Sequence, residues 1–278
     1  MYFKGFTGIG RITRTSLPFN PTVTFRFVTA DIDLNQGVNF FLPSYADDEI
    51  NSYKNLRRIV APLTGDIVGN ITLYITENMA STYYDIAYSA EEFILELYFG
   101  EGKARKFTGT KVETLTFDCK AGELVQANIA TISKTHEQES NGDTDDFIAD
   151  TASKRTSTEK IVDWTKTSIS SITSKDLASF SYVIANSLIP IKTASSLLIS
   201  YLPRGIQQVS GNIVVIDVAY PNYANDKYEI YDNSITFKVD NLSVTHRIVN
   251  HWSYRTPLSA DTIMTTLEWT RVDQLPAP

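Results

Sequence analysis

The sequence has 278 residues, enough for two domains of about 100–150 residues or for one large β domain. Its hydrophobic content of 42% and charged content of 21% are typical of a water-soluble protein with a well-filled core. The net charge of −7 argues against a surface that binds nucleic acid by neutralising phosphates, but not against a wall past which a polyanion slides without sticking.

The N-terminal stretch MYFKGFTGIGRITR lacks the apolar centre and the small-residue cleavage site of a signal peptide. No apolar run approaches the roughly 20 residues that span a bilayer. The single cysteine, Cys119, cannot form an intrachain disulfide, so nothing indicates a secreted, disulfide-rich fold. We therefore expect a protein that is made in the cytoplasm of the producing cell and has no membrane partner.

Short alternating runs rich in Val, Ile, Thr, Tyr and Phe predict half-buried strands along most of the chain. They cover residues 22–30, 69–76, 92–99 and 123–132, then 179–186, 211–218, 233–240 and 261–270. The sequence therefore predicts a mainly β protein.

One helix is predicted after Thr76, where Thr76 is a candidate cap ahead of an acidic first turn, and it is expected to end near Ser89. Its apolar positions are Met79, Tyr83, Ile86 and Ala87.

The region from Ser133 to Asp176 is rich in Ser, Thr, Asp and Lys and has few large apolar residues. Such a composition is typical of a linker that lies along the surface or packs against a neighbouring subunit. We therefore expect a first β domain over residues 1–135, a linker over 136–177 and a second β domain over 178–278.

The predicted strands recur in the same order on both sides of this linker. VGNI at Val68 matches SGNI at Ser210, an offset of 210 − 68 = 142. Similar matches join residues 92 and 233 (offset 141), 121 and 259 (offset 138), and FRFVTADIDL at Phe25 with FSYVIANSLI at Phe180. Nearly constant offsets over three elements predict an internal duplication.

The repeated glycines, Gly69 and Gly211, each come just before an alternating run. A residue without Cβ is needed where the backbone turns with φ > 0 or forms a bulge. We therefore expect both to be structural turn positions.

The sequence offers little for catalysis or metal binding. HExxH, CxxC, GxSxG, Walker A and GxGxxG motifs are absent, and NGDTDDFIAD lacks the glycine and closing Glu of a calcium loop. His246 and His251 are five apart in a predicted strand, so they face opposite sides and are expected to be exposed or at the core edge. Cys119 is expected to be a packed thiol. We expect a protein that is not an enzyme and has no cofactor or metal.

Two stretches of the sequence are similar to tail tube proteins (major tail proteins) of tailed bacteriophages. ASFSYVIANSLIPI followed by LPRGIQQVSGNIVVI resembles their strand, Asn-Leu loop, Pro- and Gly-containing segment and strand opening with (V/T)(S/T)G. TKVETLTFDCKAGELVQANIATIS resembles their strand pair joined at a Gly-Glu-Leu turn. The resemblance covers most of the second half from Ala178 and about half of the first, and it is poorest in the linker and between Asn39 and Ala61.

The resemblance implies a structural virion protein whose rings stack into the tail tube through which the genome leaves the capsid. It implies two tandem tail-tube-type β-sandwich or barrel domains, each with a flanking helix or loop. Because rings of this family are sixfold, a duplicated chain is expected to form a trimeric, pseudo-sixfold ring, with a hexamer as the rival. Expected partners are further copies of the chain, a tape-measure protein, tail terminator or baseplate proteins, and genomic DNA in transit.

Ring stacking is expected to involve the long polar loops after Phe41 and Ile191, because opposite charges there could meet across a ring interface. The candidate contact residues are Asp47, Asp48, Glu49, Lys54, Arg57, Arg58 and Arg204. An ordinary solvated loop is an equally good interpretation.

An inner strand of such a ring has one face in the water-filled lumen and the other on the core, which requires alternation. Polar candidates are Gln126, Asn128, Thr262 and Thr266, although the sequence does not say which face is the lumen. A lumen with few cations would let DNA phosphates pass with little friction.

Two alternative functions remain at this stage. A tail adaptor, distal-ring or baseplate component would use the same fold but stop at one ring. A carbohydrate-binding β-sandwich would use some of the 15 tyrosines and 3 tryptophans, although aromatic residues are equally expected in β cores.

Overall fold

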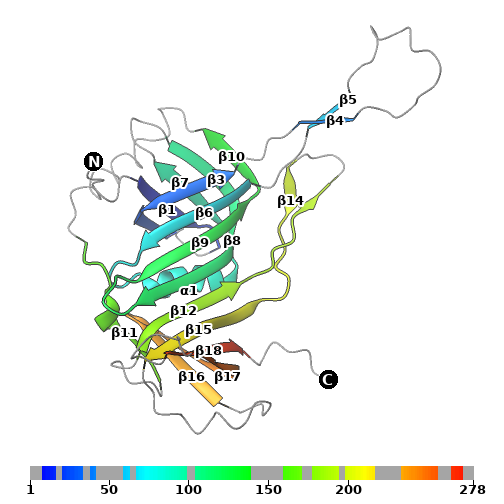
Figure 1. Cartoon of the computed structure of the whole chain (residues 1–278). Coiled ribbons are helices and arrows are strands. Elements are labelled where there is room, and N and C mark those ends of the chain that lie inside the picture. Colours follow the sequence, from blue (N-terminus) through cyan, green and yellow to red (C-terminus); the bar gives the residue numbers. More distant parts are fainter. Residues whose placement is uncertain are drawn as a thin grey trace, which may run out of the picture.

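The computed structural model describes residues 8–16, 21–33, 38–41, 59–62, 67–98, 104–138, 159–170, 177–193, 198–216, 233–255 and 264–271. This part of the chain is mainly β, as the sequence predicts, with antiparallel pairing throughout and one α-helix (Figure 1). The large sheet does not close into a barrel in these residues.

The elements of the first half are β1 (Gly8–Arg14), β2 (Thr22–Phe27), β3 (Thr29–Asp33), β4 (Val38–Phe41), β5 (Ile59–Pro62), β6 (Ile67–Tyr74), α1 (Ala80–Ser89), β7 (Phe93–Tyr98), β8 (Ala104–Lys120), β9 (Gln126–Ser133) and β10 (Thr135–Gln138). The elements of the second half are η2 (Trp164–Lys166), β11 (Thr167–Ile169), β12 (Leu177–Ala185), β13 (Ile191–Lys192), β14 (Ile199–Tyr201), β15 (Gln208–Ile216), β16 (Asn233–Val239), β17 (Leu242–Arg255) and β18 (Met264–Arg271).

The same order of strand pairing occurs twice. In the first half it is β3-β6-β9-β8-β7-β1, and in the second half it is β12-β15-β18-β17-β16-β11. A small two-stranded hairpin, β4-β5 or β13-β14, is inserted at the same place in each half. The repeated order therefore follows the repeated order of the sequence motifs.

The pairing register largely agrees with the offsets in the sequence. Gly69 pairs with Thr131, and Gly211 pairs with Trp269, which gives 211 − 69 = 142 and 269 − 131 = 138. The match at β3 differs. Ala30 pairs with Ile71 and Phe180 with Ile213, and 213 − 71 = 142, so Ala30 and not Phe25 is the counterpart of Phe180.

Strand β8 joins the two halves into one sheet. Its first residues pair with β7 and β10, while residues 114–120 pair with β12 and residues 111–118 with β9. The result is a continuous run of eight neighbouring strands, β3-β6-β9-β8-β12-β15-β18-β17, much of which crosses the front of Figure 1.

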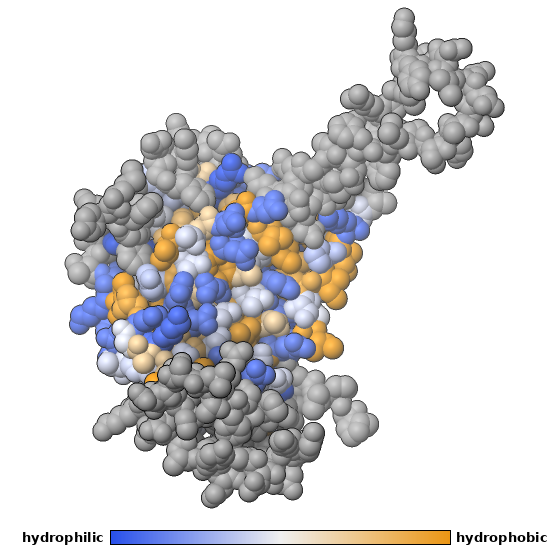
Figure 2. Space-filling view, viewed as in Figure 1, coloured by the Kyte–Doolittle hydropathy of each residue, from blue (hydrophilic) through white to orange (hydrophobic). Residues whose placement is uncertain are grey.

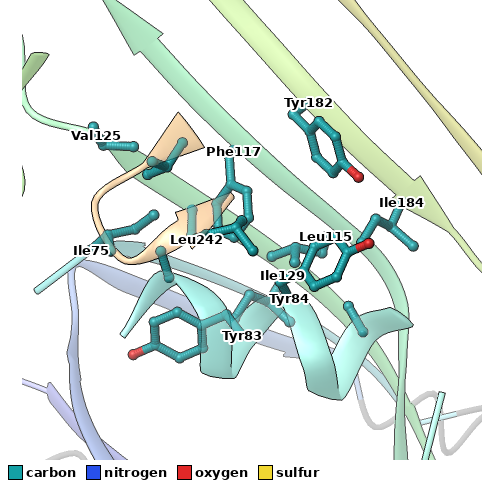
Figure 3. Packing of buried hydrophobic residues seen from close by; sticks show 14 of the residues in the cluster. Ile75, Tyr83, Tyr84, Leu115, Phe117, Val125, Ile129, Tyr182, Ile184 and Leu242 are labelled. Atoms are coloured by element: carbon teal, nitrogen blue, oxygen red, sulfur yellow. The ribbon is translucent and has the colours of Figure 1, made fainter. Parts of the chain in front are cut away.

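The two halves also share one hydrophobic core. Leu115 and Phe117 of β8 lie in the same buried cluster as Tyr182 of β12 and Leu242 of β17. Figure 3 shows α1 packed beneath these strands, with Tyr84 directed towards them. The strands of the two halves in the large sheet therefore share one core cluster.

Helix α1 ends at Ser89 as predicted, but its start is different. It begins at Ala80 without a side-chain cap of its own, so the predicted cap at Thr76 is wrong. Asn241, in the turn between β16 and β17, supplies an acceptor for the first turn, because its Oδ1 accepts from the Ser81 N–H at 3.2 Å. Just before the helix, Oδ2 of the neighbouring Asp240 accepts from the Asn78 N–H at 2.6 Å. The second half thus caps the helix of the first half.

Part of the predicted linker, residues 136–177, belongs to the body. Residues 136–138 lie in β10, and residues 159–170 pack against the first half before β11 pairs with β16. Val162 is fully buried, and its N–H donates to the Ile75 carbonyl at 2.8 Å. Residues 139–158 and 171–176 lie outside the described residues.

The prediction of turns at Gly69 and Gly211 is wrong. Both lie inside strands, β6 and β15, and neither is among the glycines with positive φ. A Cβ at Gly69 would lie 2.6 Å from Ile32 Cδ1, and one at Gly211 would lie 2.9 Å from Trp269 Cζ2. The physical reason for glycine is therefore close approach by neighbouring strands.

Candidate functional site

One candidate functional surface is the face of the eight-stranded sheet that points away from the core. We call it the polar face. Side chains alternate between the two sides of each strand, as they do in β6, where Ile71 and Leu73 are buried while Asn70 is exposed. The registers of neighbouring strands bring the outward residues into rows across both halves.

One such row shows the chemistry of the polar face. It runs from β3 to β18 through Thr29, Thr72, Asn128, Thr116, Val183, Ser210 and Thr270. The Thr72 hydroxyl donates to Asn128 Oδ1 at 2.8 Å, and Asn128 Nδ2 donates to Asp118 Oδ2 at 3.2 Å. The side chains of this row are short, most of them can form hydrogen bonds, and none is a large apolar group.

The charge of the polar face is acidic. On β3, β6, β9, β12, β15, β18 and residues 114–120 of β8, its carboxylates are Asp31, Asp33, Asp118 and Glu268. Lys120, at the end of β8, is the one cation on that face of these strands, and Arg247 is exposed on the same face of β17. The surface therefore offers phosphates few positive partners.

The structure decides which of the predicted polar residues share this face. Gln126, Asn128 and Thr266 all lie on it, because their strand neighbours Ala127 and Leu267 point into the core. Thr262 lies outside the described residues.

A second candidate surface is the arm formed by residues 188–193 and 198–207, which carries β13 and β14. It holds five of the eight exposed large hydrophobic residues that the described part of the chain shows: Ile189, Ile191, Leu198, Tyr201 and Ile206. Tyr201 is 63% exposed and Ile206 is 70% exposed. Figure 2 shows hydrophobic surface on the side where this arm leaves the body. Such a concentration is typical of an interaction surface.

The base of the arm is fixed by a buried amide network. Asn186, which is fully buried, donates through Nδ2 to the carbonyls of Ala87 and Val112, both at 2.8 Å. Gln207 Nε2 donates to Asn186 Oδ1 at 2.8 Å and to the Tyr88 carbonyl at 2.9 Å. The arm is therefore held at the last turn of α1, and its position depends on both halves.

The predicted contact residue Arg204 also lies at this base. Its Nη1 donates to the Tyr88 carbonyl at 3.1 Å, and its backbone forms a bridge with Leu188. The other predicted contacts, Asp47, Asp48, Glu49, Lys54, Arg57 and Arg58, lie outside the described residues.

His246, which the sequence predicts to be exposed or at the core edge, is buried in β17. Its Nε2 lies 2.6 Å from the Tyr182 hydroxyl, inside a cluster that also contains Phe237 and Trp269. Burial raises the pKa of Tyr182, so this hydroxyl stays protonated. The pair fills the core, and Cys119 is a buried, packed thiol as predicted.

The described residues hold no cluster of three or more His, Cys, Asp or Glu side chains able to bind a metal ion. In the same residues, no helix has the length and hydropathy required to cross a membrane. No known protein family and no curated protein matches the sequence.

Proposed function

We propose that the chain consists of two copies of one β unit and forms the stacked rings of a phage tail tube, the conduit for genome ejection. The observation that carries the proposal is the polar face, a cation-poor wall that runs without a break through two equivalent sets of strands. The stretches of sequence that resemble tail tube proteins fall on these same strands, β8, β9, β12 and β15.

The chemistry of the polar face fits a channel wall. Double-stranded DNA carries a high density of phosphates, and Lys and Arg would hold it by releasing its counterions. The carboxylates of Asp31, Asp118 and Glu268 repel phosphates, and the Thr, Ser and Asn side chains between them keep the surface hydrated. DNA would therefore pass along this wall without a specific binding site.

The two equivalent sets of strands fit a pseudo-sixfold ring. In a ring with six equivalent places, a chain with two units fills two of them, so three chains complete the circle. The polar face would then line the lumen, and α1 together with β1, β2 and β7 would lie outside it.

The exposed arm fits the contact between successive rings. A monomer seldom leaves Ile191, Leu198, Tyr201 and Ile206 in water unless a partner covers them. Stacking would bury this surface against the neighbouring ring. The protein would act as a structural virion component without catalysis, in the tail, with tape-measure, terminator or baseplate proteins as its other partners.

The proposal is tested by negative-stain electron microscopy and native mass determination on the same purified sample. Hollow tubes, with a ring mass of three chains, are the expected result. Rings that never stack would favour an adaptor or baseplate component instead, and a stable monomer under all assembly conditions would overturn the proposal.

The role of the arm has its own test. The double variant Tyr201→Ser and Ile206→Ser should leave single rings intact but stop their growth into tubes, because both residues are exposed and hold no core contact. Val28→Ser, at a residue that is 42% exposed outside the arm, is the matched control and should form normal tubes.

A further inference from the structure

The junction between the two halves has a defined register. Residues 114–120 of β8 pair antiparallel with residues 179–185 of β12, and Asp118 lies opposite Ser181. On the core side of the same junction, Phe117 lies opposite Tyr182. This is a strand-to-strand contact between the last inner strand of one unit and the first inner strand of the next.

The counterparts of these two strands are β17 and β3. Ala130 pairs with Thr114 and Glu268 pairs with His251, so β17 follows β8 with an offset of 251 − 114 = 137. Ala30 corresponds to Phe180, so β12 follows β3 with an offset of 180 − 30 = 150.

Both counterpart strands have an edge without a partner strand within the described residues. In the described part of the chain, β3 pairs with β6 alone. Residues 251–255 of β17 pair with β18 on one side, while β16 on the other side reaches only to Ile248. Among the residues that the structure describes, the segment of β17 that corresponds to the paired segment of β8 has an open edge, and so does β3, which corresponds to β12.

We propose that β17 of one copy pairs antiparallel with β3 of the next copy, with Arg255 opposite Asp31. The register follows from the internal junction: 118 + 137 = 255 and 181 − 150 = 31. Likewise, 117 + 137 = 254 and 182 − 150 = 32 place Tyr254 opposite Ile32. This inference rests on the two-unit ring proposed above and specifies how its copies join.

The physical reason lies in the strand edges. An open edge presents a row of unpaired N–H and C=O groups and is a template for another strand. Pairing of β17 with β3 satisfies both edges at once and continues the polar face into the neighbouring copy. Opposite charges directly across an antiparallel pair stabilise it, and like charges destabilise it.

The charges also select the partner. Two copies of β3 placed together would bring the carboxylates of Asp31 and Asp33 near each other. Because Asp31 and Arg255 have opposite formal charges, pairing them adds no net positive charge to the lumen.

Disulfide trapping tests the register. In the double variant Asp31→Cys and Arg255→Cys, the paired Cα atoms should lie about 4.5–5.5 Å apart, within the range that a disulfide bridges. Mild oxidation of assembled protein should give covalent trimers on non-reducing gels. The matched control, Asp31→Cys with Ser253→Cys, places the second thiol two residues away at about 7–8 Å and should remain monomeric. Cys119 can stay in both variants, because it is only 3% exposed.

Each outcome separates the junction from the proposed function. Covalent trimers from a protein that never forms tubes would support the junction and contradict the tail tube. The double variant Asp31→Cys and Arg255→Cys could form tubes without cross-linking, or could cross-link no more than the control. Either result would contradict the proposed pairing of β17 with β3 but not the proposed tail tube. Covalent dimers from Asp31→Cys alone would instead show β3 paired with β3.

A charge exchange gives an independent measurement if the cysteine variants fold poorly. Asp31→Arg and Arg255→Asp should each weaken ring formation by about tenfold, measured as the subunit concentration at half assembly. The double exchange should restore most of the loss. Single variants that assemble like the wild type would contradict the register.

Discussion

The indole of Trp269 lies against Gly211, its register partner in β15, so closely that a Cβ at residue 211 would be 2.9 Å from Cζ2 of the ring. The same Cβ would also overlap the Ser181 carbonyl oxygen. Gly211→Ala should therefore push β12, β15 and β18 apart and lower the free energy of unfolding by about 3 kcal/mol. The change is measured from the urea midpoint at constant m-value.

Gly69 is the matched control, because it occupies the equivalent place in the first half. A Cβ there would meet Ile32 Cδ1 at 2.6 Å and Thr131 Oγ1 at 2.7 Å, and both are ends of side chains that can move. Gly69→Ala should therefore cost less, about 1 kcal/mol. Equal losses at the two positions would contradict the argument from backbone contact at Gly211.

The cap of α1 by the second half predicts a second stability effect. Asn241→Ala removes the acceptor for the Ser81 N–H and the donor to the Asn78 carbonyl, at 3.2 and 3.0 Å. The loss should be about 1 kcal/mol, seen as a lower urea midpoint. Asn212→Ala, at an exposed asparagine of β15, should change stability by less than about 0.5 kcal/mol. A similar effect at both positions would mean that α1 does not depend on this cap.

Alkaline pH should destabilise the fold through buried protonated groups. Burial, aided by Glu123, Asp163 and Asp118, raises the pKa of Cys119 from 9.0 to about 12, and burial raises the pKa of Tyr83 and Tyr182 above 10.0. The folded state then binds more protons than the unfolded chain once the pH exceeds the unfolded pKa. The stabilisation is therefore complete below about pH 9 and is lost as the pH rises towards the folded pKa.

Melting temperatures should accordingly stay level from about pH 7 to 8.5 and fall steadily above. Cys119→Ala should remove the part of the fall that begins near pH 9, and slopes are compared because the smaller side chain lowers stability at every pH. Tyr201→Phe, at an exposed tyrosine, should keep the wild-type slope. A Cys119→Ala slope equal to the wild type would contradict this cause.

The polar face predicts that assembled tubes do not hold DNA until cations are added. Asn212→Lys with Glu268→Lys places lysines on this face and should make tubes retain short double-stranded DNA, with an affinity that falls at least about tenfold between 50 and 200 mM salt. Thr22→Lys with Asp85→Lys makes the same charge change on β2 and α1, in the outer layer. DNA retention by the control variant alone would place the lumen on the other side of the sheet.

Features that depend on local periodicity could be predicted from the order of residues in the chain. Alternation of apolar and polar residues gave the strands around Ile71, Ile129 and Ile213, and a period of 3.6 residues gave the helix that ends at Ser89. Repeated motifs gave the offsets of 142 and 138, which the registers reproduce at Gly211 and Trp269. These features need only neighbours within a few residues, or a comparison of the chain with itself.

Which segments meet depends instead on contacts between residues that are far apart in the chain. The Thr76 cap fails because α1 begins at Ala80, where Asn241 from the other half of the chain accepts from the Ser81 N–H. Gly69 and Gly211 resemble turn residues in sequence, yet they serve close strand contacts that only register reveals. The composition around Val162 predicts a linker, yet Val162 is buried and its N–H donates to the Ile75 carbonyl. Alternation shows that strands have two faces, but only packing against α1 shows which one is the core and which one, with Asp118 and Glu268, meets water.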